Sequence, residues 1–170
     1  MTDKGIYEFI EASKIISQRK IPAKFIIVGT LDKKNPTSLS EYELKSIEKM
    51  PFIEYKGYVK DVNRLLQKID IACLPSYREG LSKFLIEAGA SGKPIVTTDA
   101  PGCREVVVNG ENGFVVPVKD AFALSEAIAL LCLDKNKREH MGEMSRSMIE
   151  KFFSMNIVIE KIMNVYKSFY

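Results

Sequence analysis

The 170-residue chain is long enough to bury a sizeable core within one domain, and its apolar fraction of 46% is typical of a globular protein. Its net charge of +3 is too small, and its lysines and arginines are too dispersed, to favour nucleic acid as a partner. No apolar run reaches the roughly 20 residues needed to cross a bilayer, and the polar N-terminus does not look like a signal peptide.

Cysteine and histidine are scarce. Cys73, Cys103 and Cys132 are odd in number and show no metal-ligand spacing, so we expect reduced thiols in the cytoplasm and no metal site. His140 is the only histidine. Chemistry that depends on histidine would therefore have to use His140 or another chain.

The first part of the chain alternates predicted helices with predicted strands. Apolar residues recur at helical spacing after Lys4-Gly5, and Pro22 ends that pattern. Ser40 and Glu43 have the spacing of a capping box, and Asp61 can cap a further helix. In chain order we expect a helix over 6–20, a strand over 23–29, a polar loop over 31–40, a helix over 40–50, a strand over 52–57 and a helix over 61–66.

The second part continues the alternation and then becomes helical. Asp120 and Ser154 are candidate N-caps. We expect strands over 69–74, 95–98 and 114–116, and helices over 81–92, 120–133, 135–151 and 154–169. Strands that alternate with helices predict an α/β fold, with a largely parallel, Rossmann-like sheet covered by helices on both faces.

Two carboxylates bracket the helix predicted after the strand over 69–74. Glu79 precedes its first turn and Glu87 lies eight residues later, roughly 12 Å further along the axis. The unpaired N–H groups and the positive dipole end between them favour a phosphate. A ligand with a central diphosphate and hydroxyl-bearing rings at both ends fits this spacing, as a nucleotide sugar does.

Five segments in the same order resemble the C-terminal, donor-binding half of retaining glycosyltransferases of family four, which have the two-lobed GT-B fold. They are Pro75-Ser76-Tyr77-Arg78-Glu79-Gly80-Leu81, the later Glu87, Gly92-Lys93-Pro94-Ile95-Val96, Pro101-Gly102-Cys103-Arg104-Glu105-Val106 and Asn112-Gly113-Phe114-Val115-Val116-Pro117. The resemblance runs from about Lys4 to the C-terminus. Within the family, the chain looks most like enzymes that build capsule or O-antigen repeat units.

The resemblance implies a role for each of three charged residues. Glu79 would face the transferred sugar and act as the catalytic residue, whereas Glu87 would accept hydrogen bonds from the ribose hydroxyls. Lys4 would contact the diphosphate. Isolated glutamates or lysines at such positions are more often solvated charges, so it is the flanking segments that favour a donor site.

Further donor contacts are implied around these charges. Gly80, Leu81 and Ser82 would supply backbone N–H groups, and Lys83 could steer the phosphates, although a surface charge is the simpler interpretation of this lysine. Tyr58-Val59 matches the segment that lines the base, with ordinary strand-end packing as the alternative. The family often has Gly-Phe-Gly or Gly-Leu-Pro at this position. Gly80-Leu81-Ser82 differs at the third residue, which leaves the choice of sugar open.

One departure from the family pattern affects the fold. The family's first strand, which lies in the middle of its sheet, is missing before Lys4. We hypothesise that Met1 is a truncation start, and that the gap in the sheet either closes or is filled by another chain. Residues 1–153 would form the nucleotide-sugar-binding domain, and the apolar helix of residues 154–170 would cross to the missing N-terminal acceptor lobe or favour self-association.

The resulting interpretation is a glycosyltransferase that transfers a sugar, with retention, from a UDP-sugar to a glycan or polyprenyl-linked acceptor. No metal or other cofactor is required if protein groups stabilise the departing diphosphate, and no Asp-x-Asp pair is present. We expect a cytoplasmic protein, with weak attraction to an anionic inner membrane face compatible with its charge. The alternatives are a non-catalytic nucleotide-binding or assembly module and a nucleotide-sugar epimerase of the same architecture.

Overall fold

The structure, a computed structural model, describes residues 2–31 and 37–169, so part of the predicted 31–40 loop and the proposed start at Met1 lie outside the described residues. The expected elements are present, with small shifts at their ends. The helices are the short 3-10 helix η1 (Thr2–Lys4), α1 (Ile6–Gln18), α2 (Glu41–Glu48), α3 (Val62–Leu66), α4 (Lys83–Ala90), α5 (Ala121–Leu133), α6 (Lys135–Phe152) and α7 (Met155–Lys167). The strands are β1 (Phe25–Val28), β2 (Ile53–Gly57), β3 (Ala72–Leu74), β4 (Ile95–Thr98) and β5 (Gly113–Val116).

The predicted helix caps are confirmed at three of four positions. Ser40 and Glu43 form a complete capping box at α2, and Asp61 and Asp120 each accept a hydrogen bond from a backbone N–H in the first turn of their helix. Ser154 occupies the N-cap position of α7, but its side chain accepts no such bond. The prediction that its side chain caps α7 is therefore wrong.

All strand pairs in the described part of the chain are parallel, as expected, but they form two sheets. β1 pairs with β2, while β4 lies between β3 and β5. The division falls between β1 and β3, where no strand ladder joins the two sheets within residues 2–31 and 37–169. The described residues therefore do not form one continuous family-like sheet.

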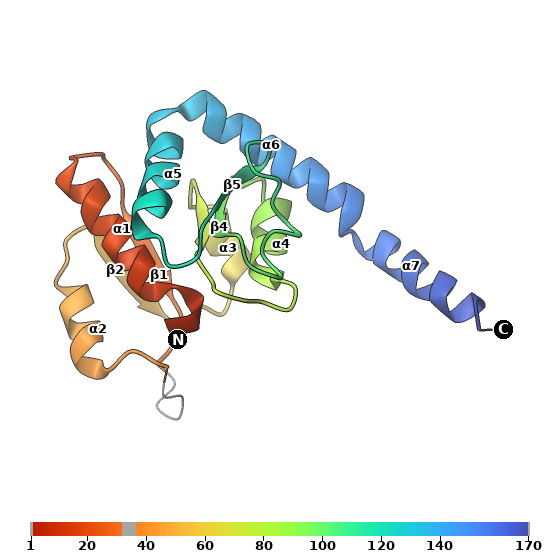
Figure 1. The fold of residues 1–170 in the computed structure, drawn as a ribbon, viewed down its shortest axis with the longest axis horizontal. Coiled ribbons are helices and arrows are strands. Elements are labelled where there is room, and N and C mark those ends of the chain that lie inside the picture. Colours follow the sequence, from red (N-terminus) through yellow and green to blue (C-terminus); the bar gives the residue numbers. More distant parts are fainter. Residues whose placement is uncertain (1, 32–36, 170) are drawn as a thin grey trace.

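Helices cover both faces of the structure, and those on one face hold the two sheets together. On one face α1 and α5 pack side by side over a core that contains Phe25 of β1, Ile53 of β2, Val96 of β4 and Val116 of β5, so a single core spans both sheets (Figure 1). On the other face α3, α4 and α6 cover a second core around the three-stranded sheet. The expected α/β fold with helices on both faces is confirmed.

The last helix lies outside this body. α7 follows α6 and points away from the rest of the chain (Figure 1), and none of its residues is buried. Most of its apolar side chains are exposed, among them Ile159 (50%) and Ile162 (49%). Neither α7 nor any other helix of the described residues combines the length and apolarity that a membrane crossing requires.

The N-terminal residues bridge the two sheets near their carboxyl ends. The N–H of Thr2 donates to the carbonyl of Thr37 in the segment between β1 and α2 (2.6 Å), and the N–H of Tyr77, after β3, donates to the carbonyl of Asp3 (2.8 Å). Gly5 follows in a left-handed conformation (φ 69°), and a Cβ there would lie 2.0 Å from the carbonyl oxygen of Pro75. These contacts fix where η1 ends and α1 begins, and so they fix the position of Lys4.

Candidate donor-binding site

The loop from residue 75 to residue 82 carries most of the predicted site. It leaves the carboxyl end of β3 and leads into α4, at the edge of a parallel sheet where ligands of α/β proteins commonly bind. The loop rests on the segment after β4, because the N–H of Glu79 donates to the carbonyl of Pro101 (2.9 Å). Gly102, in a left-handed conformation (φ 79°), lies so close that a Cβ would be 2.5 Å from the carbonyl oxygen of Glu79. The Pro101-Gly102 segment thus shapes the loop that presents Glu79.

Glu79 is paired with Lys4 from the start of the chain. The Lys4 Nζ lies 2.6 Å from Glu79 Oε1, and the Glu79 side chain is only 15% exposed whereas that of Lys4 is 42% exposed. A half-shielded, charge-assisted hydrogen bond of this kind is stronger than an exposed ion pair. The structure therefore brings together the predicted catalytic carboxylate and the predicted diphosphate-binding lysine.

Glu87 also has a lysine partner. Lys83 Nζ lies 3.5 Å from Glu87 Oε1, one turn earlier on α4, and the Lys83 side chain is 88% exposed. Such an exposed pair within a helix contributes little stability, so both groups can change partner readily. Each predicted donor carboxylate thus contacts a predicted donor lysine.

The start of α4 corrects one detail of the predicted site. Ser82 is the N-cap, and its Oγ accepts a hydrogen bond from the N–H of Leu85 (3.4 Å) while its own N–H donates to the carbonyl of Gly102 (3.1 Å). The N–H of Ser82 is therefore used inside the fold and does not point to a ligand. The N–H groups of Gly80 and Leu81 have no acceptor in the described part of the chain, and both residues are exposed.

Tyr58 and Val59 stand apart from the other predicted site residues. They follow β2, which belongs to the two-stranded sheet, and Tyr58 is 76% exposed. No hydrogen bond or ion pair among the described residues joins them to Glu79 or Glu87. Their predicted role in lining the base remains a prediction.

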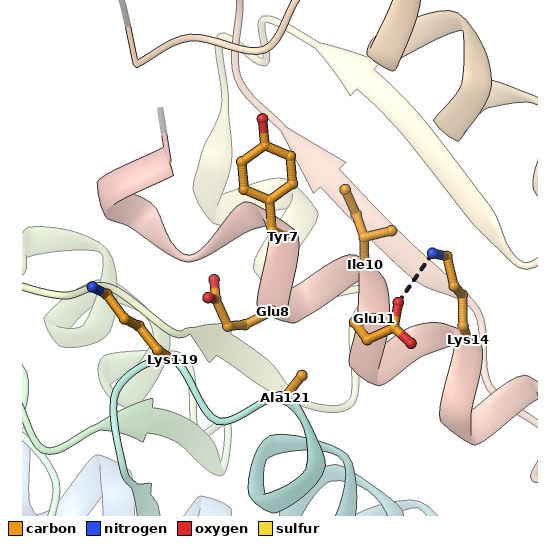
Figure 2. Close-up of a pocket in the computed structure, with 7 residues that line it drawn as sticks. All are labelled: Tyr7, Glu8, Ile10, Glu11, Lys14, Lys119 and Ala121. Carbon is orange, nitrogen blue, oxygen red and sulfur yellow. Dashed lines mark hydrogen bonds and ion pairs between the residues drawn. The ribbon is translucent and has the colours of Figure 1, made fainter.

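Three residues in or beside the loop were not predicted as site residues from the sequence. The Tyr77 hydroxyl donates to Glu8 Oε1 on α1 (2.6 Å), and Lys119 Nζ lies 5.3 Å from the centre of the Tyr77 ring. Glu8 and Lys119 line one hollow of about 320 Å³ between α1 and the segment before α5 (Figure 2). Burial, together with the hydrogen bond to Glu8, raises the pKa of Tyr77 to about 12. These contacts join residues far apart in the sequence, so no local pattern indicates them.

The described residues contain no cluster of three histidine, cysteine or acidic side chains suited to hold a metal ion. The three cysteines are unpaired, and burial raises the pKa of each thiol, to about 12 for Cys73. None of the thiols is therefore an ionised nucleophile near neutral pH.

These features define a parallel α/β domain with a polar site at the carboxyl ends of its strands. The family model described as "Glycosyl transferases group 1" matches residues 1–148, and the chain belongs to this family. It is 33% identical over 167 residues to the capsular polysaccharide biosynthesis glycosyltransferase CapM of Staphylococcus aureus, a match that covers 98% of the chain and 43% of CapM. It is 34% identical over 163 residues to an N,N'-diacetylbacillosaminyl-diphospho-undecaprenol alpha-1,3-N-acetylgalactosaminyltransferase of Campylobacter jejuni, covering 96% of the chain and 41% of that enzyme.

Solved structures agree on the fold. The C-terminal domain of a group 1 family glycosyl transferase from Francisella tularensis superposes with a TM-score of 0.80 at 23% identity, covering 91% of this chain and 82% of that one. HepE of Anabaena, in complex with UDP, gives a TM-score of 0.87 at 21% identity, covering 99% of this chain and 46% of that one. The chain spans less than half the length of the curated relatives it matches.

Proposed function

We propose that this chain is the donor-binding part of a retaining glycosyltransferase that uses a UDP-sugar to build a capsule-like or O-antigen-like glycan. The observation that carries the proposal is the pairing of Glu79 with Lys4 beside the start of α4, with Glu87 further along the same helix. The names of the relatives, which include a capsule glycosyltransferase and a polyprenyl-diphosphate-linked glycan transferase, support the class of reaction and of acceptor.

The groups at the site match the parts of such a donor. The exposed N–H groups of Gly80 and Leu81, the positive dipole end of α4 and the ammonium of Lys4 suit the diphosphate. The carboxylate of Glu87 suits a ribose diol, since it can accept two hydrogen bonds. The carboxylate of Glu79 is left to face the sugar.

The same groups would assist the chemical step. Cleavage of the bond between the sugar and the phosphate develops positive charge at the anomeric carbon and negative charge on the departing diphosphate. Lys4 and the N–H groups before α4 would stabilise that negative charge, and Glu79 would lie on the side where positive charge develops. In this proposal protein groups supply the required charges, so the reaction would need no metal ion.

The acceptor-binding groups would come from outside the 170 residues, because the relatives are more than twice as long as the matched region. We expect residues 1–170 alone to bind UDP weakly and to transfer little or no sugar to a lipid-linked acceptor. We expect the protein to act in the cytoplasm, at the inner face of the membrane, where such a lipid-linked acceptor is held.

Calorimetric titration with UDP tests the proposal directly. Glu87→Ala removes a charged hydrogen-bond acceptor for the ribose, and a loss equal to one charge-assisted hydrogen bond would weaken UDP binding about 10- to 100-fold. The matched control is Glu139→Ala, because Glu139 forms a similar i,i+4 pair with Lys135, also at 3.5 Å, on α6. Equal UDP affinity in Glu87→Ala and the unmodified chain would remove Glu87 from the site. A thermal-shift screen of nucleotide sugars would then identify the sugar and the base, since a ligand of the folded state raises the Tm.

A further inference from the structure

Lys119 has a backbone conformation that is unusual for its residue type. Within residues 2–31 and 37–169, positive φ angles occur at six glycines and at only two other residues, Lys20 (φ 59°) and Lys119 (φ 62°). Glycine adopts this left-handed conformation without strain, whereas a lysine does so at an energetic cost. Backbone strain of this kind clusters at functional sites. For Lys119, the use is indicated by its position over the Tyr77 ring.

The Tyr77 ring links three separate parts of the chain. Its hydroxyl donates to Glu8 in the first turn of α1, its face receives the ammonium of Lys119 from the segment after β5, and its backbone N–H donates to the carbonyl of Asp3. The second carboxylate oxygen of Glu8 is buried and has no hydrogen-bond partner among the described residues. Glu8 therefore makes its hydrogen bond to Tyr77 in a shielded place, where that bond is hard to replace with water.

Tyr77 lies two residues before Glu79, and Asp3 lies one residue before Lys4. The contacts of Tyr77 with α1 and with Asp3 thus connect the two backbone segments whose side chains form the 2.6 Å Lys4–Glu79 pair. From this arrangement we propose that Lys119, Tyr77 and Glu8 form a positioning cluster that holds the Glu79 loop against the start of α1 and thereby sets the distance between Lys4 and Glu79 for donor binding. The inference rests on the proposed function, in that the donor is taken to be a UDP-sugar.

Replacement of the strained lysine by glycine separates positioning from stability. In Lys119→Gly the backbone strain is relieved while the contact with Tyr77 is lost, so we expect an unchanged or higher Tm together with a roughly three- to tenfold weaker UDP affinity. Lys20→Gly is the matched control, because Lys20 has the same strained conformation at the opposite end of α1. It should show the same Tm behaviour and an unchanged UDP affinity. Lys119→Arg keeps a cation over the Tyr77 ring, so this variant should keep most of the UDP affinity of the unmodified chain.

Tyr77→Phe tests the other half of the cluster and adds a measurement that does not need UDP, the hydrogen exchange of the loop. This variant keeps the ring but removes the hydroxyl, so we expect faster hydrogen exchange in the 75–82 loop and, as for Lys119→Gly, weaker UDP binding. In the Tyr77→Phe background, Lys4→Gln should weaken UDP binding by a smaller factor than it does alone, because the lysine is no longer held in place.

Two further results would separate the cluster from the donor site. If the unmodified chain binds UDP, and Lys119→Gly and Tyr77→Phe change neither its affinity nor the exchange of the loop, the cluster does not position the site. If loop exchange rises in Tyr77→Phe but no form of the protein binds UDP, the positioning stands and the proposed donor is wrong.

Discussion

Lys4 offers the most direct test of the candidate site, because it is the one predicted diphosphate ligand that the fold places against Glu79, the predicted catalytic carboxylate. Lys4 forms a partly exposed ion pair with Glu79 that is worth about 1 kcal/mol. A charged hydrogen bond to a diphosphate is worth about 1.5–3 kcal/mol. The difference, about 0.5–2 kcal/mol, corresponds to a roughly two- to thirtyfold weaker UDP affinity in Lys4→Gln. Because Glu79 would then remain unpaired and repel the phosphates, we expect the upper part of this range.

The assay is calorimetric titration with UDP at low and at moderate salt. Lys14→Gln is the control, because Lys14 lies on α1, the helix that follows Lys4, is 40% exposed and pairs with Glu11 at 3.0 Å. It changes the net charge by the same amount as Lys4→Gln, and it should leave the affinity within twofold of the original. A local role for Lys4 predicts a loss that persists at both salt concentrations, since a contact in a half-buried site is screened little. If both lysine variants bind UDP as tightly as the unmodified chain, Lys4 does not contact the diphosphate.

Three further predictions follow from the described residues. With a pKa of about 12, about one Cys73 thiol in 10,000 is ionised at pH 8. Iodoacetamide should therefore label Cys73 about a thousandfold more slowly in the folded chain than in urea. Comparable labelling rates would contradict the burial of this thiol. The exposed apolar face of α7 should cause self-association. The double variant Ile159→Lys with Ile162→Lys should self-associate less, as measured by sedimentation velocity. A monomeric unmodified chain would argue against this prediction. Backbone N–H groups alternate in direction along a strand, so the N–H of Ile26 points to the edge of β1 that pairs with no strand of the described residues. Its hydrogen exchange should be faster than that of the Ile27 N–H. Equal protection of the two N–H groups would mean that another strand pairs with this edge.

Local features of the fold were predictable because the residues that cause them are close in sequence. The capping box of Ser40 and Glu43 and the cap at Asp120 depend on groups three residues apart, so the pattern fixes the contact. The parallel α/β class likewise follows from the order of apolar runs. Ser154 shows the limit of this reasoning, since its position was predicted correctly and the bond of its side chain was not.

The site was predictable only in part, because its contacts join distant segments. The resemblance indicated both Lys4 and Glu79, but that they form an ion pair depends on how η1 packs against the loop after β3. The resemblance assigned the N–H of Ser82 to the ligand, but in the structure this N–H donates to the carbonyl of Gly102. No spacing rule predicts that Gly102 lies this close to the loop. The positioning contacts of Tyr77 are of the same kind.

The divided sheet and the candidate site are connected through η1. No strand ladder joins β1 to β3 in the described residues, so near the carboxyl ends of the strands the two sheets are linked by the hydrogen bonds of Thr2 and Asp3. Lys4 is the next residue, and its side chain reaches Glu79. A relative movement of the sheets would therefore shift the ammonium of Lys4 relative to the Glu79 loop. Because a charged contact weakens with each ångström of added distance, the affinity for a diphosphate in this protein should depend on how firmly the two sheets are held together.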